Sequence, residues 1–254
     1  MNKKIVLFVN DSYFSYLLSK RFIDVNVNNI SLIIFSKSTS NSFRKVWDIF
    51  KKVTMSYFLY RLFIQVLSGT LYKKKSVEHL ANVYNIKKIY VYNDWELKCA
   101  VQNNNYIAFA FNFDMIFKEN ILSSFQNGIY NIHASKLPKD KGVSPVLWAF
   151  ARGDKYIWST IYKMDKGLDT GPILKQIQIS VHPDDTAFSL YKRVCIESGF
   201  ALKDISQKIF DNQMQLVNQS DEVESNYFSW PDERFKLMMK KSNRRLFEIK
   251  DLFS

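Results

Sequence analysis

Short, uninterrupted runs of apolar residues recur along this sequence, and they constrain its fold more than any other feature. The strand-like runs occupy residues 5–9, 32–35, 88–92 and 106–111. Runs of this length are typical of strands that are covered on both faces. Segments with helical spacing separate them and begin near Ser12, Ser76 and Asp94. Strands that alternate with helices predict an α/β fold with a mostly parallel sheet and flanking helices.

The turn after the first run reads Asn10-Asp11-Ser12 and contains no glycine. A dinucleotide-binding turn of the dehydrogenase type needs glycines here, because the backbone must approach the pyrophosphate closely. The whole chain has only seven glycines. The sequence therefore disfavours a dehydrogenase-type cofactor site, and Ser12 instead offers a cap for the first helix.

The same alternation continues after residue 140. Pro145 stands at a first-turn position of a helix that we predict over 144–152. Two strand-like segments follow, at 159–164 and 173–181, and they bracket a glycine-containing loop.

The C-terminal part of the sequence changes character. A long helix is predicted over 187–212, because its apolar residues recur on one face. Residues 226–253 are rich in Lys and Arg and predict a hairpin or a short helix. We expect a main α/β domain over 1–185 and a C-terminal helix with a small lobe over 186–254.

Residues 37–75 form a basic and aromatic insertion between predicted strands. Apolar residues recur in it at helical spacing, which predicts one or two helices packed on the sheet. A second interpretation is that 43–68 contact a membrane surface or a partner helix. Arg61 and Gln65 argue against a membrane-spanning segment.

The net charge of +12 predicts an anionic partner. Nucleic acid, a membrane surface, a phosphorylated metabolite and a polyglutamyl cofactor all satisfy this condition. Cys99 and Cys195 are far apart and in no metal-ligand spacing, so we expect neither a disulfide nor a metal site. The apolar run after Lys3 and Lys4 is too short for a signal peptide, and we expect a cytoplasmic protein.

The polar residues that best fit a catalytic site lie between Tyr130 and Gly171. Asn131 and His133 are two positions apart in an extended segment, so their side chains point to the same side. Gly142 helps to end this segment in a loop. The pair is therefore expected at the carboxyl edge of the sheet, where open α/β sheets bind ligands.

A carboxylate in a later loop completes the pattern. Asp169 lies between glycines, and a carboxylate beside His133 would hold its tautomer and increase its basicity. Ser135 lacks the strained turn of a serine hydrolase nucleophile. An amide, an imidazole and a carboxylate without a nucleophile suit direct attack by a substrate amine on a bound acyl group. His79 and His182 are expected to be structural.

These motifs resemble those of the 10-formyltetrahydrofolate-dependent formyltransferases. Members of that family carry Asn-x-His-Pro-Ser-x-Leu-Pro and, downstream, Asp-x-Gly-x-Asp-Thr-Gly. The chain has Asn131-Ile132-His133 and an interval of 36 residues from His133 to Asp169 that also fits. The likeness is strongest over 104–182 and implies a Rossmann-like fold. The chain departs from the pattern at Ala134 and at 139–141.

The resemblance assigns roles to individual residues. It implies that Asn131 polarises the formyl carbonyl, that His133 relays the proton and that Asp169 orients His133. It also implies that 10-formyltetrahydrofolate is the formyl donor and that its pteridine lies against two loops. The residues of those loops are Phe111, Asn112, Phe113, Asp114, Met115, Asp165 and Gly167.

Within this family, the chain is most similar to the nucleotide-sugar N-formyltransferases. It lacks a glycine-rich phosphate loop, and too few residues follow the long helix for the tRNA-binding barrel of the initiator-tRNA enzymes. The resemblance implies a dTDP- or UDP-linked dideoxy-amino sugar as acceptor, for surface polysaccharide (O-antigen) biosynthesis. Lys75, Lys139 and Lys141 are candidates for binding its phosphates, and a homodimer is an open prediction.

Three other functions stay open at this point. The first is formyl transfer to methionyl-tRNA, although the resemblance leads us to expect no nucleic acid. The second is a non-catalytic module that binds folate or nucleic acid. The third is hydrolysis of formyltetrahydrofolate, with water in place of the amine.

Overall fold

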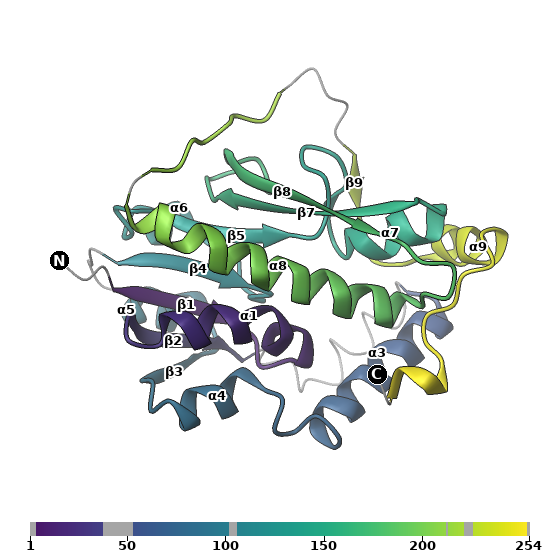
Figure 1. The fold of residues 1–254 in the computed structure, drawn as a ribbon, viewed down its shortest axis with the longest axis horizontal. Helices are drawn as coiled ribbons and strands as arrows, with labels where there is room; N and C mark the ends of the chain where they lie inside the picture. Colours follow the sequence, from purple (N-terminus) through teal and green to yellow (C-terminus); the bar gives the residue numbers. More distant parts are fainter. Residues whose placement is uncertain (1–3, 38–52, 102–105, 212, 221–225, 253–254) are drawn as a thin grey trace.

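The computed structural model describes residues 4–37, 53–101, 106–211, 213–220 and 226–252. Within these residues the chain forms a seven-stranded sheet with the strand order β3-β2-β1-β4-β5-β7-β8 (Figure 1). The strands are β1 (Ile5–Val9), β2 (Ile30–Ser36), β3 (Lys88–Val91), β4 (Ile107–Phe111), β5 (Ile129–His133), β7 (Tyr156–Lys163) and β8 (Ile173–Ser180).

The sheet is parallel from β3 to β5 and antiparallel beyond it. β1 pairs with β2 and β4 in parallel, and β4 pairs with β5 in parallel. β7 runs antiparallel to β5, and β8 runs antiparallel to β7. The expected mostly parallel sheet is confirmed. In the antiparallel part, Tyr130 near the start of β5 lies opposite Lys163 at the end of β7, so the loop between β7 and β8 begins beside the amino end of β5.

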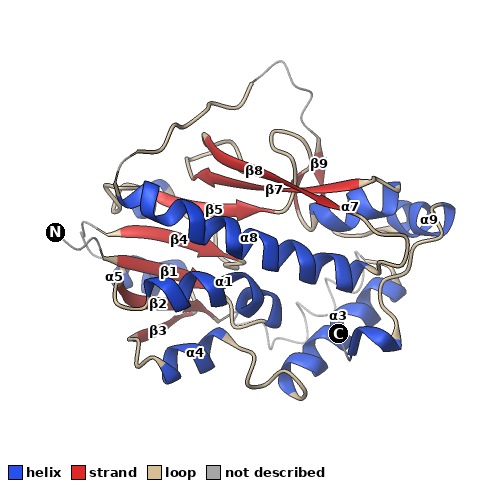
Figure 2. Cartoon of the chain, in the orientation of Figure 1, coloured by secondary structure: helices blue, strands red, loops and turns tan. Residues whose placement is uncertain are grey.

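Helices cover both faces of the sheet (Figure 2). They are α1 (Tyr13–Asn26), α3 (Met55–Gly69), α4 (Val77–Val83), α5 (Asp94–Ala100), α6 (Glu119–Leu122), α7 (Pro145–Arg152), α8 (Ala187–Phe210), α9 (Glu233–Lys241) and the 3-10 helix Ile249–Leu252. The side chains of β1 explain this arrangement. Ile5 and Leu7 point to one apolar core, and Val6 and Phe8 point to a second one.

Helix ends follow the local sequence. Ser12 caps α1 as predicted, because its hydroxyl accepts the N–H of Ser15. The cap of α5 is Asn93, where the sequence had suggested Asp94. The Asn93 side chain accepts the N–H of Glu96, while Asp94 is already helical.

The long C-terminal helix belongs to the main core. α8 packs along α1, and Leu190 and Leu202 lie in the same apolar cluster as Ile5 and Leu7. The tail after α8 forms α9 and the short 3-10 helix. Of the two predicted possibilities, a hairpin or a short helix, the helix is the one observed.

A two-residue strand, β9 (Tyr227–Phe228), returns from the tail to the body of the protein. It pairs in parallel with β6 (Lys141–Gly142), which lies in the loop after β5. Phe228 stacks on Trp148 of α7 with ring centroids 4.9 Å apart. The tail thereby supports the loop that borders the candidate site.

The predicted insertion is partly described. α3 confirms a helix in its second half, whereas residues 38–52 lie outside the described residues. α3 buries Tyr57, Tyr60 and Leu67. None of the helices that the structure describes is long and apolar enough to cross a membrane.

Candidate active site

Asn131 and His133 lie at the carboxyl end of β5, between β4 and β7. The antiparallel register places Asn131 opposite Tyr162 and His133 opposite Thr160. Directly opposed residues of two strands have their side chains within reach of each other. The Asn131 amide accordingly donates to the Tyr162 hydroxyl over 3.0 Å.

Asp169 reaches the same place from the loop between β7 and β8. The carboxylate of Asp165 shapes this loop by accepting the N–H of Gly167 over 3.0 Å and the hydroxyl of Thr170 over 2.7 Å. Asp169 itself has a φ of 54°, in the left-handed region. Gly171 leaves no room for a side chain, because a Cβ there would lie 1.9 Å from the carbonyl oxygen of Lys163.

The structure brings the three predicted catalytic residues together. The Tyr162 hydroxyl donates to Asp169 Oδ1 over 2.9 Å and so connects Asp169 with Asn131. His133 Nδ1 lies 3.7 Å from Asp169 Oδ2. His133 and Asp169 are both 8% exposed, so their interaction is only weakly screened by solvent.

The second ring nitrogen of His133 faces the backbone. Its Nε2 lies 3.1 Å from the carbonyl oxygen of Asp140. A carbonyl oxygen can only accept a hydrogen bond, so Nε2 carries a hydrogen in this arrangement. Nδ1, which faces Asp169, is therefore the nitrogen that is open to an incoming proton.

The Tyr162 hydroxyl remains a hydrogen-bond donor at physiological pH. Burial raises the pKa of Tyr162 far above its usual value, and the nearby charge of Asp169 raises this pKa further. The phenol consequently keeps its proton and directs it at Asp169. Its oxygen accepts from Asn131, which leaves the second amide N–H of Asn131 available to a ligand.

Ser135 is engaged elsewhere. Its hydroxyl donates to the carbonyl oxygen of Lys139 over 3.0 Å. The hydroxyl therefore supports the loop and is not activated by His133. This agrees with a site in which the protein supplies no nucleophile.

Among the apolar residues predicted to contact folate, Phe111 lies in the protein interior, and Phe113 and Met115 are half-buried. Phe111 is fully buried and meets Phe22 edge to face, with ring centroids 5.6 Å apart. Phe113 stacks on Phe117, and Met115 packs on the same apolar cluster. These side chains hold the loop after β4 in place.

The two polar residues of this loop also have partners within the protein. Asn112 has a φ of 51°, and its amide oxygen accepts from the Tyr191 hydroxyl over 3.3 Å. Asp114 accepts from the Asn10 amide over 3.1 Å and from the Ser36 hydroxyl over 3.2 Å. The ends of β1, β2 and β4 are thereby joined at the carboxyl edge.

The three predicted phosphate-binding lysines do not share one place. Lys139 and Lys141 belong to the loop beside His133. Lys75 lies over the rings of Tyr72 and Tyr13, in a separate 360 Å³ pocket that also contains Lys73. The sequence alone did not distinguish the two locations.

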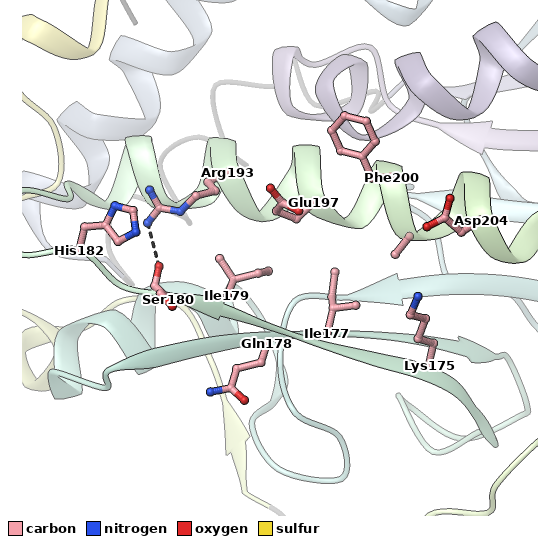
Figure 3. A pocket seen from close by; sticks show the side chains of 11 residues that line it. Lys175, Ile177, Gln178, Ile179, Ser180, His182, Arg193, Glu197, Phe200 and Asp204 are labelled. Atoms are coloured by element: carbon pink, nitrogen blue, oxygen red, sulfur yellow. Dashed lines mark hydrogen bonds between the residues drawn. The ribbon is translucent and has the colours of Figure 1, made fainter.

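Another cavity, of 490 Å³, is also separate from these residues. It lies between β8 and α8, and Figure 3 shows Arg193 reaching from α8 to the carbonyl of Ser180. Neither Asn131, His133 nor Asp169 lines it. The described residues hold no cluster of three or more His, Cys, Asp or Glu side chains arranged for a metal ion.

Four residues of the site were missed by the sequence prediction. Tyr162 and Asp140 contact the predicted catalytic residues directly, and Arg152 holds Asp140. Gln219 donates to the carbonyl oxygens of Asp169 (3.0 Å) and Gly171 (2.8 Å) from the segment after α8. Tyr162 could have been found by pairing the strand at 159–164 with the one that ends at His133.

Comparisons with known proteins show relatives that match part of this chain. The chain is 33% identical over 156 residues to the bifunctional polymyxin resistance protein ArnA of Wigglesworthia glossinidia brevipalpis, covering 61% of the chain and 23% of that protein. It is 33% identical over 107 residues to the methionyl-tRNA formyltransferase of Myxococcus xanthus, covering 42% of the chain and 34% of that protein. The matched segments therefore span about a quarter and a third of these curated relatives.

Solved structures show the same fold. WlaRD, a sugar 3N-formyl transferase solved with dTDP and 5-N-formyl-THF, has a TM-score of 0.62 and 24% identity, covering 90% of this chain and 70% of that one. The N-formyltransferase of Helicobacter canadensis was solved in complex with folinic acid and dTDP-3-aminofucose. It has a TM-score of 0.62 and 22% identity, and the match covers 89% of this chain and 71% of that one. The family model for formyl transferase matches residues 74–203, just over half of the chain, and this protein belongs to that family.

Proposed function

We propose that this protein transfers a formyl group from 10-formyltetrahydrofolate to the amine of a nucleotide-linked amino sugar. The observation that carries the proposal is the convergence of Asn131, His133 and Asp169 at the carboxyl edge of the sheet. Ser135, two positions after His133, is not an activated nucleophile, since its hydroxyl donates to the carbonyl oxygen of Lys139. Direct transfer between two substrates suits such a site.

The proposed chemistry uses both sides of the site. The substrate amine attacks the formyl carbon and forms a new C–N bond, and the free N–H of Asn131 stabilises the oxyanion that develops. His133 accepts the proton of the amine at Nδ1, where Asp169 stabilises the resulting positive charge. The bond from the formyl carbon to N10 of the folate then breaks, and N10 takes up a proton.

The loop after β4 suits the pteridine in one respect. The side chains of Phe111, Asn112 and Asp114 are held by other parts of the protein. A flat, polar ring placed there would meet backbone donors and acceptors of the loop. Asp165 and Gly167 would contribute indirectly, because the hydrogen bond between them shapes the loop that carries Asp169.

Two classes of formyl acceptor, amino sugars and methionyl-tRNA, are supported by different comparisons. The two structures with TM-scores of 0.62 are a sugar 3N-formyl transferase with dTDP and an N-formyltransferase in complex with dTDP-3-aminofucose. The methionyl-tRNA formyltransferase of Clostridium thermocellum has a TM-score of 0.51. Methionyl-tRNA remains the second candidate, because several curated relatives in sequence are methionyl-tRNA formyltransferases.

The proposal has four finer parts. The acceptor is a dTDP- or UDP-linked dideoxy-amino sugar, and its formylation serves surface polysaccharide (O-antigen) synthesis. The enzyme is cytoplasmic and dimeric. The net charge of +12 would favour approach of a sugar nucleotide diphosphate and of folate carboxylates.

The test is a transfer assay with 10-formyltetrahydrofolate and a panel of dTDP- and UDP-linked amino sugars, read by mass spectrometry as the gain of one formyl group. Parallel reactions contain methionyl-tRNA or no acceptor. We expect formylation of a sugar nucleotide, and a loss of about 10²- to 10⁴-fold in turnover for His133→Ala. His79→Ala is the matched control and should keep full activity. Transfer only to methionyl-tRNA, release of formate without transfer, or full activity of His133→Ala would each contradict the proposal.

A further inference from the structure

The backbone of Asp140 is held in place from three sides. Its φ is 55°, in the left-handed region that asparagine and aspartate tolerate better than most residues. Its carboxylate accepts two hydrogen bonds from Arg152, of 3.1 and 2.7 Å. Its N–H donates to the side chain of Asn226 over 2.7 Å. These contacts aim the carbonyl oxygen of Asp140 at His133 Nε2.

Arg152 is a firm anchor for this carboxylate. It stands in the last turn of α7, and it also binds Asp154 over 2.8 Å. The Arg152 and Asp140 side chains are 29% and 13% exposed, so this bidentate pair is shielded more than an ordinary surface ion pair. Burial works against the charge of Arg152, but the hydrogen bonds that Arg152 donates to Asp140 and Asp154 outweigh it and raise the Arg152 pKa.

We infer that Arg152 and Asp140 are positioning residues for His133. Together they form a clamp that holds the Asp140 carbonyl on Nε2 and thereby keeps Nδ1 turned toward Asp169. The inference rests on the proposed function in one respect, which is that His133 accepts a proton during formyl transfer. The clamp touches neither the amine nor the formyl group.

The physical reason is that the imidazole ring of His133 can adopt two orientations, related by half a turn, that place different atoms beside Asp169. A ring rotated by half a turn about its Cβ–Cγ bond would present a carbon atom to Asp169 and move Nδ1 away. The Asp140 carbonyl opposes this rotation, because it would lose its hydrogen bond to Nε2. Without the clamp, His133 would spend part of its time in unproductive orientations.

The chain offers a graded set of variants. In Asp140→Asn, the new side chain still tolerates the left-handed φ and keeps part of the hydrogen bonding with Arg152. Asp140→Ala removes these hydrogen bonds and places a residue there that tolerates the left-handed φ less well. Arg152→Met removes the anchor, and Arg152→Lys keeps its charge. Asp154→Asn is the matched control, because it removes the other partner of Arg152 and leaves the pair with Asp140 in place.

Kinetics provide the first measurement. We expect kcat for formyl transfer to fall about 10- to 100-fold in Asp140→Ala and Arg152→Met, with little change in KM for either substrate. Arg152→Lys and Asp140→Asn should lie between these variants and the parent protein. Asp154→Asn should behave like the parent protein. Circular dichroism and a thermal midpoint for each variant show that it is folded.

The second measurement does not depend on activity. The sequence contains three histidines, so ring-¹⁵N labelling yields few signals, and His133→Gln assigns the one from His133. We expect an Nε2–H signal of His133 that exchanges slowly with water in the parent protein and in Asp154→Asn. In folded Asp140→Ala and Arg152→Met, this signal should exchange fast or disappear.

The two measurements separate the possible failures. A slowly exchanging His133 signal in both disruptive variants overturns the clamp, whatever their kcat. Loss of that signal with unchanged kcat overturns its role in catalysis. If the parent protein transfers no formyl group, the proposed function fails, and the labelling experiment still decides whether Arg152 and Asp140 hold His133.

Discussion

At the scale of single residues, the hydroxyl of Tyr162 joins the two halves of the candidate site. It accepts from Asn131 on β5 and donates to Asp169 in the loop after β7. Tyr162 is 1% exposed, so water has little access to its hydroxyl. The position of the Asp169 carboxylate thus depends on the phenol of Tyr162, which lies opposite Asn131 on the neighbouring strand.

Replacing Tyr162 by Phe removes this hydroxyl without leaving a large cavity. We expect the free energy of unfolding to fall by about 1–3 kcal/mol, because Asp169 and Asn131 each lose a buried partner. We expect kcat for formyl transfer to fall about 10-fold or more, since Asp169 is no longer held. Urea denaturation and initial rates measure the two effects.

Tyr84→Phe is the control for this substitution. It removes an exposed hydroxyl that donates to Asp24, far from the site in the chain. Little change in either quantity is expected for it. Equal stability and equal kcat for Tyr162→Phe and the parent protein would show that the bridge has no role.

At the scale of elements, the close contact of α1 with α8 ties the long C-terminal helix to the sheet. Gly199 of α8 lies against the backbone of α1, where an added Cβ would be 2.6 Å from the carbonyl oxygen of Leu18. Next to it, the Ser198 hydroxyl donates to Ser159 of β7 over 2.8 Å. α8 therefore supports β7, which carries Tyr162.

Gly199→Ala should destabilise the protein although alanine favours helices. The new methyl group must push α8 away from α1, at a cost of about 1–3 kcal/mol in the free energy of unfolding. Gly69→Ala is the matched substitution, because a Cβ there meets nothing within 4 Å. It should be neutral or stabilise by up to about 1 kcal/mol. Chemical denaturation compares them, and equal effects would contradict the close contact.

At the scale of the whole molecule, the boundary predicted at 185/186 coincides with a strong connection. The carboxylate of Asp185 accepts the N–H of His182 over 2.7 Å and pairs with Arg193 of α8. Arg193 also donates to the carbonyl of Ser180 at the end of β8. The helix that opens the predicted C-terminal lobe is therefore bound to the last strand of the sheet.

The connection predicts a pH dependence of stability. Burial tends to raise the pKa of Asp185, but the hydrogen bonds from Arg193 and His182 outweigh it, so this pKa is lowered in the folded state. A lowered carboxyl pKa contributes stability above the unfolded value of about 3.9. That contribution disappears as the pH falls through the folded value.

Asp185→Asn should therefore lose about 1.5–3 kcal/mol of unfolding free energy at pH 7. Its difference from the parent protein should shrink once the pH falls below about 4, which urea denaturation at several pH values measures. Asp204→Asn, an exposed change on the same helix, is the control. A difference that stays constant down to about pH 3 would contradict the proposed linkage.

Much of the fold could be predicted because it depends on local patterns. The apolar runs at 5–9 and 106–111 became the central strands β1 and β4, and Ser12 capped α1. The ends of other elements depended on contacts from outside. The strand expected from Ser159 begins at Tyr156, because β8 pairs with it as far as Ser180.

The sequence by itself determined the strand pattern and the three residues Asn131, His133 and Asp169 as candidates. Their chemistry is visible in residue types and spacing, and the sheet edge follows from alternation. The tertiary structure alone decided that Tyr162 bridges two of them and that the Asp140 carbonyl faces His133. Those contacts depend on the register of an antiparallel pair and on a left-handed turn, which arise only when distant segments pack together.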